Sequence, residues 1–199
     1  MKIIGLAGPS GAGKGEFCAI LTKLGIFSIN TDNVYHKLLV PPSACLDELC
    51  AHFGYGILKA DGTLDRAALA RIVFAPGNES ELDALNKITH FHVLNKVRSI
   101  IADFSKFPCP AVIVDAPALF ESGFDAECDT VVSVLANKAI RIDRIMQRDG
   151  LSYEAAAERI NAQKPDEFYI ERSDHVFYNN SDLEEFKRQV LAVFTPEVG

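Results

Sequence analysis

The sequence predicts a three-layer α/β/α fold built around a parallel sheet, and three observations support this prediction. Short continuous apolar runs, at residues 3–6 and 111–114, are typical of strands that are buried on both faces. Between such runs lie stretches whose apolar residues recur every three or four positions, as in residues 14–24, and this spacing indicates amphipathic helices. Third, a glycine-rich loop joins the first strand to the first helix. Strands that alternate with helices in this way are expected to form a doubly wound α/β sheet.

The glycine-rich loop reads Gly-Pro-Ser-Gly-Ala-Gly-Lys-Gly over residues 8–15. A strand, a glycine loop, a lysine and a helix in this order form the P-loop arrangement. The glycines let successive backbone N–H groups turn inward around a phosphate chain, and the helix directs its positive end at the same anion. A glycine turn without a ligand is the alternative, but the flanking strand and helix favour a nucleotide site. We expect ATP to be bound by Gly8, Gly11, Ala12, Gly13, Lys14, Gly15 and Glu16.

The two residues after Lys14 depart from the usual pattern. A P-loop carries Ser or Thr directly after the lysine, where the hydroxyl binds magnesium, but here Gly15 and Glu16 follow. Adenylate and cytidylate kinases also carry glycine at the first of these positions, with threonine next, so Glu16 is the unusual residue. It takes away a metal ligand and adds a negative charge near the phosphates.

Composition indicates one globular domain and excludes some classes of partner. The chain has 199 residues, a net charge of −7 and a pI near 5.2. This charge argues against general binding to nucleic acid or membranes, although a local basic pocket can still bind a small anion. The longest apolar runs are too short to span a membrane, a strand rather than a signal peptide opens the sequence, and the five cysteines include no C-x-x-C pair. We therefore expect reduced thiols and a cytoplasmic location.

The rest of the chain follows the same alternation, apart from one helical block. A second strand is expected at residues 26–29, followed by a helix that starts at Thr31 or Asp32. Helices near 44–53, 66–74 and 79–104 then follow without an obvious central strand, which predicts a helical insertion on the substrate side. The remaining strands are expected at 111–114, 130–134 and 175–178, and the remaining helices at 138–149, 153–163 and 182–194.

Two aspartates follow predicted strands, where ligands bind in open α/β sheets. Asp32 comes directly after the second strand, and phosphoryl transfer to an alcohol needs a carboxylate to take up the hydroxyl proton. Asp32 could equally cap the next helix. Asp115 ends an apolar strand, which resembles a Walker-B carboxylate that holds magnesium directly or through water. The alternative for Asp115 is an aspartate that only begins a turn.

Basic residues gather in the last third of the chain. Arg141, Arg144 and Arg148 are spaced to share one helix face, and Arg159 follows after the Asp149-Gly150 break. Paired helices that carry arginines suit a lid that closes over phosphates, although a solvated helix face is the alternative for any one arginine. Three histidines could contact a substrate or be structural, and none lies in a cluster of metal-ligating residues in the sequence: His36, His90 and His92.

Taken together, these motifs resemble the dephospho-coenzyme A kinase family over residues 2–180. Asn30-Thr31-Asp32 stands where the family has Asp-Ala-Asp, and the run at residues 61–66, Asp-Gly-Thr-Leu-Asp-Arg, resembles its helical domain. The run from Val114 to Glu121 and the sequence Gln-Arg-Asp-Gly at 147–150 resemble its third strand and lid. Besides Gly15 and Glu16, the chain departs from the family pattern at Asn30 and at Phe91, where the family has Asp and Pro.

The resemblance implies a reaction and roles for individual residues. ATP and Mg²⁺ would phosphorylate the ribose 3′-hydroxyl of dephospho-coenzyme A, giving coenzyme A and ADP. Lys14 would offset charge on the β- and γ-phosphates, and Arg148, helped by Arg144 or Arg141, would clamp the transferred group. Asp32 would accept the proton, and Asp115 would be the candidate metal ligand. The substrate side would include Asp32, His36, Arg66, His90 and Arg159.

The expected organisation is a single P-loop kinase domain over residues 1–199. Its core would comprise about 1–35, 108–137 and 172–199, with a helical substrate subdomain at about 36–107 and an arginine-bearing lid at about 138–171. Two alternatives stay open: a nucleoside-monophosphate-type kinase, and a nucleotide-binding regulator that has lost turnover because of Gly15 and Glu16. The sequence leaves the oligomeric state undetermined.

Overall fold

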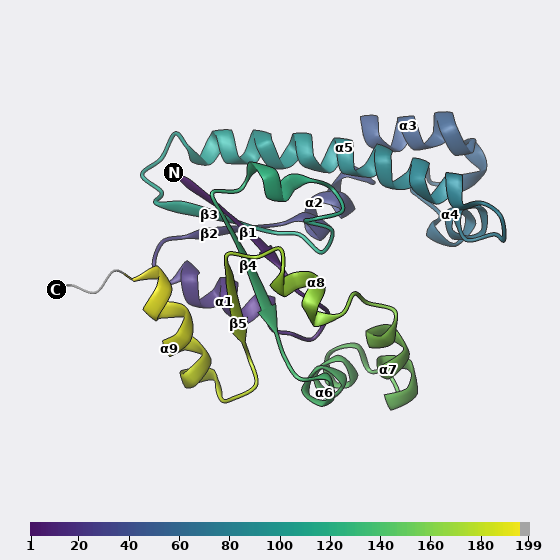
Figure 1. The fold of residues 1–199 in the computed structure, drawn as a ribbon. Helices are drawn as coiled ribbons and strands as arrows, with labels where there is room; N and C mark the ends of the chain where they lie inside the picture. Colours follow the sequence, from purple (N-terminus) through teal and green to yellow (C-terminus); the bar gives the residue numbers. More distant parts are fainter. Residues whose placement is uncertain (196–199) are drawn as a thin grey trace. The chain divides into compact units, whose positions relative to one another are not determined.

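The computed structural model describes residues 1–195, which fall into two compact units (Figure 1). One unit comprises Met1–Ile29 together with the chain from Phe104 onward, and the other comprises Asn30–Asp103. The first unit contains the sheet and the glycine loop, and the second is helical. We describe each unit separately.

The sheet has five strands in the order β2-β3-β1-β4-β5. Its central strand β1 pairs in parallel with β3 on one side and β4 on the other, and β4 pairs in parallel with β5. The predicted α/β fold with a parallel sheet is thus confirmed. The carboxyl ends of parallel strands lie at one edge, so the loops after β1, β3, β4 and β5 meet there. The strands are β1 (Lys2–Ala7), β2 (Phe27–Asn30), β3 (Ala111–Asp115), β4 (Thr130–Leu135) and β5 (His175–Tyr178).

Helices α1 (Lys14–Thr22) and α9 (Leu183–Phe194) lie side by side and share a hydrophobic core with the strands (Figure 1). Phe17 and Phe186 are fully buried there, and the ring of Phe17 lies 5.5 Å from that of Phe177 in β5. Strand residues on both faces are buried, as the fully buried β3 shows. This explains why the strands read as continuous apolar runs rather than as alternating patterns.

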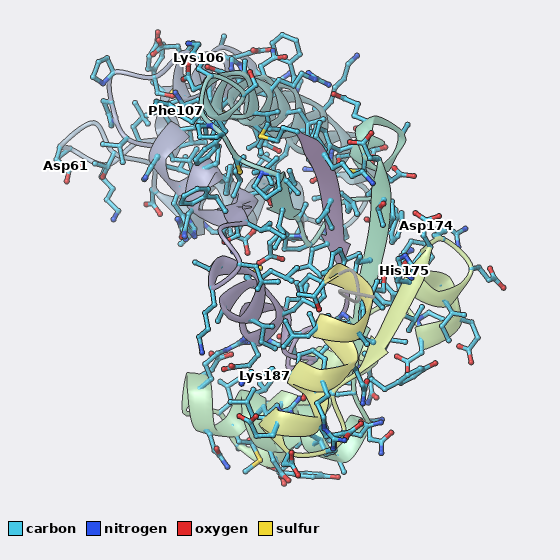
Figure 2. All side chains as sticks on the ribbon, turned by 90° about the vertical axis from the view of Figure 1, so that its left-hand side faces the viewer. Asp61, Lys106, Phe107, Asp174, His175 and Lys187 are labelled. Carbon is cyan, nitrogen blue, oxygen red and sulfur yellow. The ribbon has the colours of Figure 1, made fainter. Side chains whose placement is uncertain are left out.

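Strand β5 is anchored at its start by Asp174, which Figure 2 labels beside His175. The Asp174 carboxylate accepts a hydrogen bond from the Val131 N–H at 2.7 Å, and the Asp174 N–H donates to the Val131 carbonyl at 2.9 Å. These two bonds fix β5 beside β4. They also fix where β5 ends, which determines the position of Asn179.

Helices α6 (Lys138–Asp149) and α7 (Tyr153–Asn161) form a hairpin with its own small core. Ile142 and Ile145 of α6 pack with Ala156 and Ile160 of α7. Gly150, at φ 66°, ends α6 in a left-handed conformation that favours glycine, so the chain turns within three residues. The short helix α8 (Asp166–Ile170) follows and contacts β4.

The second unit consists of helices packed around a separate apolar cluster that includes Leu46, Leu49, Ile57 and Leu69. Helices α3 (Ala44–Phe53) and α4 (Arg66–Val73) begin at side-chain caps, because Ser43 accepts from the Leu46 N–H and Asp65 accepts from the N–H groups of the first turn of α4. The helices are α2 (Thr31–Leu38), α3 (Ala44–Phe53), α4 (Arg66–Val73) and α5 (Glu79–Phe104), and a 3₁₀ turn lies at Tyr55–Ile57.

The elements agree with the sequence predictions to within one or two residues at most boundaries. Apolar periodicity does not detect α8 or the 3₁₀ turns at Tyr55–Ile57 and Phe124–Glu127, because each is shorter than two helical turns. No helix within residues 1–195 is long and apolar enough to cross a membrane.

Candidate active site

The glycine loop has the backbone conformation that a phosphate site requires. Gly8, Gly11 and Gly13 have φ values of 135°, 79° and 106°, a region that side chains disfavour. A Cβ at Gly8 would lie 2.3 Å from the Val134 carbonyl oxygen, so packing also excludes other residues there. Helix α1 begins at Lys14, directly after the loop, so the positive end of its dipole favours an anion bound at the loop.

Lys14 lies over the loop that precedes it. Its Nζ donates a hydrogen bond to the carbonyl oxygen of Gly8 at 2.8 Å. This bond keeps the ammonium group beside the phosphate-binding amides. A bound phosphate can therefore meet the lysine without a large movement of the side chain.

Gly15 and Glu16 are both exposed in the first turn of α1. A Cβ at Gly15 would meet no atom within 4 Å, so packing does not require glycine at this position. A serine would fit there, which means that the missing hydroxyl is a chemical feature of this chain and not a steric necessity. Glu16 stands at the positive end of the helix, where a carboxylate is electrostatically favourable.

Asn179 and Arg144 hold the glycine loop by donating hydrogen bonds to its carbonyl groups. The Asn179 side chain is buried and donates to the Ala12 carbonyl at 3.0 Å. Arg144 donates to the carbonyls of Gly11 and Ala12 at 3.2 and 3.3 Å, and to the Asn179 carbonyl at 3.1 Å. Because these bonds hold the loop carbonyls on one side, the N–H groups of the same peptides are directed to the other.

Arg141 and Gln163 support the loop at Ser10. Arg141 is only 5% exposed, and its Nε donates to the Ser10 carbonyl at 3.0 Å. The Gln163 Oε1 accepts from Arg141 at 2.5 Å and from the Ser10 N–H at 3.3 Å. Burial lowers the pKa of Arg141, but guanidinium remains charged at neutral pH. Arg141 is therefore committed to protein groups.

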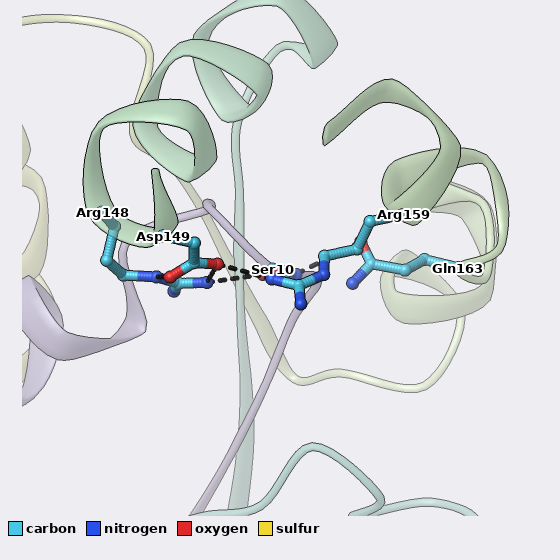
Figure 3. Close-up of polar contacts among 5 residues, drawn as sticks. All are labelled: Ser10, Arg148, Asp149, Arg159 and Gln163. Atoms are coloured by element: carbon cyan, nitrogen blue, oxygen red, sulfur yellow. Dashed lines mark hydrogen bonds and ion pairs between the residues drawn. The ribbon is translucent and has the colours of Figure 1, made fainter. Parts of the chain in front are cut away.

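Arg148 and Arg159 form an exposed cationic pair joined by Asp149 (Figure 3). Arg148 donates to the Asp149 carboxylate through Nε at 2.7 Å and NH2 at 2.9 Å, and Arg159 donates to it at 2.5 Å. Arg148 also reaches the Ser10 hydroxyl at 3.3 Å. The hydrogen bond from Arg148, with further contributions from Arg159, lowers the pKa of Asp149 to about 2. Two guanidinium groups thus share one carboxylate, and that of Arg148 also contacts the phosphate loop.

Asp115 is buried at the last position of β3, where it is in register with Leu6 of β1. Its charge acts on Cys18 in α1, because burial and then the Asp115 charge raise the pKa of that thiol to about 12. Residues 1–195 contain no group of three or more His, Cys, Asp or Glu side chains that could hold a metal ion.

The helical unit contains all the predicted substrate-side residues except Arg159, which lies in α7 of the sheet-containing unit. Asn30 caps α2, since its Oδ1 accepts from the Asn33 N–H at 2.9 Å, so Asp32 is not the N-cap and stays exposed in the first turn. Arg66 donates to the Nδ1 of His36 at 2.5 Å, which joins two predicted residues from different helices. Guanidinium has only donors, so this nitrogen of His36 is the acceptor in the contact. His90 lies half-buried in α5.

Comparison with known proteins assigns the chain to a family. The family model described as dephospho-CoA kinase matches residues 2–185. The chain belongs to the dephospho-CoA kinase family. A dephospho-CoA kinase from Moorella thermoacetica is 37% identical over 195 residues, which cover 98% of this chain and 91% of the relative.

Solved structures agree with the assignment. The dephospho-CoA kinase from Campylobacter jejuni is 28% identical, has a TM-score of 0.68 and covers 96% of this chain and 94% of its own. The protein TT1252 from Thermus thermophilus is 31% identical, with a TM-score of 0.79 over 100% of this chain and 98% of its own. This dephospho-CoA kinase family member is therefore an enzyme of the kinase class that acts in coenzyme A biosynthesis. The predicted family, fold class and reaction are confirmed.

The structure brings part of the predicted site together and adds residues to it. Lys14, Arg144 and Arg148 all contact the loop in the sheet-containing unit, whereas Asp32, His36, Arg66 and His90 belong to the helical unit. Sequence reasoning assigned no role to three residues that contact the loop or its arginines: Asp149, Gln163 and Asn179. Each lies more than 130 positions from the loop, so only the resemblance of the surrounding motifs could have indicated them.

Proposed function

We propose that this chain transfers the γ-phosphoryl group of ATP to the ribose 3′-hydroxyl of dephospho-coenzyme A, giving coenzyme A and ADP. The observation that carries the proposal is the glycine loop with Lys14 over it and the Arg148–Asp149–Arg159 group beside Ser10. We further propose a single kinase domain, with a core, a helical substrate subdomain at about 36–107 and a lid at about 138–171. The five free thiols favour a cytoplasmic location.

The phosphate chain of ATP is held by the loop amides from Gly8 to Glu16, and Lys14 offsets negative charge on the β- and γ-phosphates. Arg148 clamps the transferred group. Arg144 contributes through the loop carbonyls that it holds. Phosphoryl transfer requires little covalent work from the protein, so catalysis rests on positioning and electrostatic stabilisation.

The acceptor hydroxyl is activated by Asp32, which accepts its proton. The capping of α2 by Asn30 supports this role, because it leaves the Asp32 carboxylate exposed and not engaged as the helix cap. His36 and Arg66, already joined by a hydrogen bond, contact the dephospho-coenzyme A side together with His90 and Arg159. Arg66 and Arg159 supply guanidinium donors for anionic groups of this substrate.

Mg²⁺ is the divalent ion that we propose for this site. When bound, it neutralises charge on the phosphates of ATP. Asp115 would hold it directly or through a water molecule, and Gly15 contributes no hydroxyl ligand. The small number of protein ligands fits an ion that keeps several waters and binds largely through substrate phosphates.

A coupled assay of ADP release, with ATP, Mg²⁺ and dephospho-coenzyme A, tests the proposal. We expect turnover that requires dephospho-coenzyme A, and we expect Asp32→Asn to lower kcat by about 100-fold or more, as loss of a general base does. Asp83→Asn is the matched control, because Asp83 is an exposed carboxylate in the same unit. A folded protein that binds ATP but shows no turnover with this acceptor would contradict the proposal.

The same assay separates the two alternatives. Turnover with nucleoside monophosphates in place of dephospho-coenzyme A would indicate a nucleoside-monophosphate-type kinase. The exposed Gly15-Glu16 pair is the observation that favours the second alternative, a regulator that binds nucleotide without turnover. Nucleotide binding with no acceptor-dependent ADP release would support it.

A further inference from the structure

We infer that Asp149 is a positioning residue that holds Arg148 and Arg159 together as one oriented cationic unit beside the phosphate loop. This inference rests on the proposed function, in which Arg148 clamps the transferred phosphoryl group and Arg159 contacts the dephospho-coenzyme A side. Asp149 does not contact the reacting atoms in this scheme. It acts through the two guanidinium groups that it binds.

The contacts define one unit (Figure 3). One carboxylate oxygen of Asp149 accepts from Arg148 Nε, and the other accepts from both Arg148 NH2 and Arg159 NH1. Arg148 is thus held in a bidentate geometry, which fixes the plane of its guanidinium group. Its NH2 also reaches Ser10 Oγ at 3.3 Å, so the fixed plane is directed at the loop.

Electrostatics explain why a carboxylate is needed here. Two guanidinium groups that approach this closely repel one another, and the carboxylate between them offsets that repulsion while leaving a net positive charge. Asp149 is the last residue of α6, where the negative end of the helix dipole disfavours a carboxylate. The positive charges of Arg148 and Arg159 offset this unfavourable interaction of the Asp149 carboxylate with the helix dipole.

The backbone around Asp149 is also fixed. Gly150 turns the chain in a left-handed conformation, and Ser152 begins α7 by accepting from the Ala155 N–H at 3.3 Å. Buried Ile145 and Ala156 hold the two helices together. This short connection returns Arg159, ten positions later, to the carboxylate of Asp149.

The guanidinium groups keep donors for a ligand. Each has five N–H donors, and the contacts with Asp149 and Ser10 occupy three of those on Arg148. The contact with Asp149 occupies one on Arg159. The remaining donors can bind phosphate oxygens while Asp149 keeps both groups oriented. We therefore expect Asp149 to support transfer more than it supports ground-state binding of ATP.

Steady-state kinetics of Asp149→Asn provide the first test. We expect kcat to fall about tenfold or more, because misplaced catalytic groups cost up to about 100-fold. We expect KM for ATP to stay unchanged or to fall, because the variant is more positive at this site. Asp143→Asn, an exposed carboxylate on the same helix, is the matched control and should leave both constants unchanged. An unchanged or higher kcat in Asp149→Asn would overturn the inference, because it would show that transfer does not need the carboxylate to orient the arginines.

Adding Asp149→Asn to a variant that already lacks both arginines tests whether Asp149 acts through them. In a background that carries Arg148→Ala and Arg159→Ala, Asp149→Asn should have no further effect on kcat. An unchanged tenfold loss in that background would show that Asp149 acts by another route and would overturn the inference.

NMR of the guanidinium Nε–H group of Arg148 tests the contact without any turnover. In the ligand-free protein its signal should be shifted and protected from exchange with water, and Asp149→Asn should abolish both properties. A signal that is identical in the two proteins would overturn the inference. If the wild type shows the protected signal but no turnover with dephospho-coenzyme A, the proposed function fails while the contact stands.

Discussion

At the scale of single residues, two glycines of the loop lack a side chain for different reasons. Gly13 lacks a side chain because Asn179 fills that space: a Cβ there would lie 2.1 Å from the Asn179 amide nitrogen. Gly15 also lacks a side chain, but no neighbouring atom excludes one, since the space around its Cβ position is open. The two glycines therefore predict opposite outcomes on substitution.

Gly13→Ala should weaken ATP binding. The new methyl group displaces the Asn179 amide, and a φ of 106° adds backbone strain of roughly 1–3 kcal/mol. We expect the Kd for ATP, measured by calorimetric titration, to rise about tenfold or more, which corresponds to about 1.4 kcal/mol. The control is Gly25→Ala, because Gly25 also has a positive φ (78°) but no atom lies within 4 Å of its Cβ position. Equal affinities in the two variants would contradict the prediction.

Gly15→Ser should supply the magnesium ligand that the chain lacks. We expect the Mg²⁺ concentration for half-maximal activity to fall by about three- to tenfold, since one added polar contact contributes about 1 kcal/mol. Gly15→Ala is the matched control, because both variants gain about 0.5–1 kcal/mol of helix stability and only serine adds a hydroxyl. If alanine lowers the Mg²⁺ requirement as much as serine does, the effect comes from the helix and not from the metal.

At the scale of elements, the α6–α7 hairpin separates two kinds of arginine. Arg141 and Arg144 lie where α6 faces the loop and are committed to main-chain carbonyls. Arg148 lies at the end of the same helix and, with Arg159 of α7, remains largely exposed. The three arginines of α6 share one helix face by their spacing of three and four positions, but only the packing against the loop reveals that their functions differ.

The stability contributed by the Asp149 contacts should depend on pH in a defined direction. The pKa of Asp149 is lowered from 3.8 to about 2, so the folded state favours the ionised carboxylate. This contribution is complete above about pH 4 to 5 and is lost as the pH falls toward 2. The difference in urea midpoint between wild type and Asp149→Asn should thus be constant from pH 7 to 5 and shrink below pH 4. A difference that grows on acidification would contradict the assigned contacts.

At the scale of the whole molecule, the glycine loop depends on segments from all parts of the sheet-containing unit. Strand β4 limits the space at Gly8, α6 binds Ser10 and Gly11, and the residue after β5 binds Ala12. Nucleotide that binds the loop therefore stabilises contacts that span this unit. Binding should be visible in global unfolding and not only at the loop.

Mg·ATP should raise the melting temperature of the protein. At a ligand concentration of about 100 times Kd, binding adds about 2.7 kcal/mol. For a chain of this size that corresponds to a shift of about 5–10 °C. Lys14→Ala should abolish most of the shift in a thermal unfolding assay, and Lys23→Ala, an exposed lysine beyond the end of α1, should retain it. A shift that survives Lys14→Ala would place the nucleotide elsewhere.

The sequence predicts the elements well because their signals are local. The run at 111–114 and the periodicity of 138–149 agree with β3 and α6, and only elements shorter than two turns, such as α8, escape detection. The roles of the arginines could not be separated in this way, because they depend on partners far along the chain. Asn179 and Ala12 are 167 positions apart, and no pattern in either segment indicates their contact.

The contacts between the glycine loop and distant segments of the chain also have a consequence for the synthesis of the protein. The groups that shape the loop, from Val134 to Asn179, are translated more than 100 codons after the loop itself. Contacts between such distant segments form late in folding. A nascent chain therefore carries its nucleotide motif for most of translation without a nucleotide site. A chain that stops before Asn179 should therefore bind ATP more weakly than one that includes it.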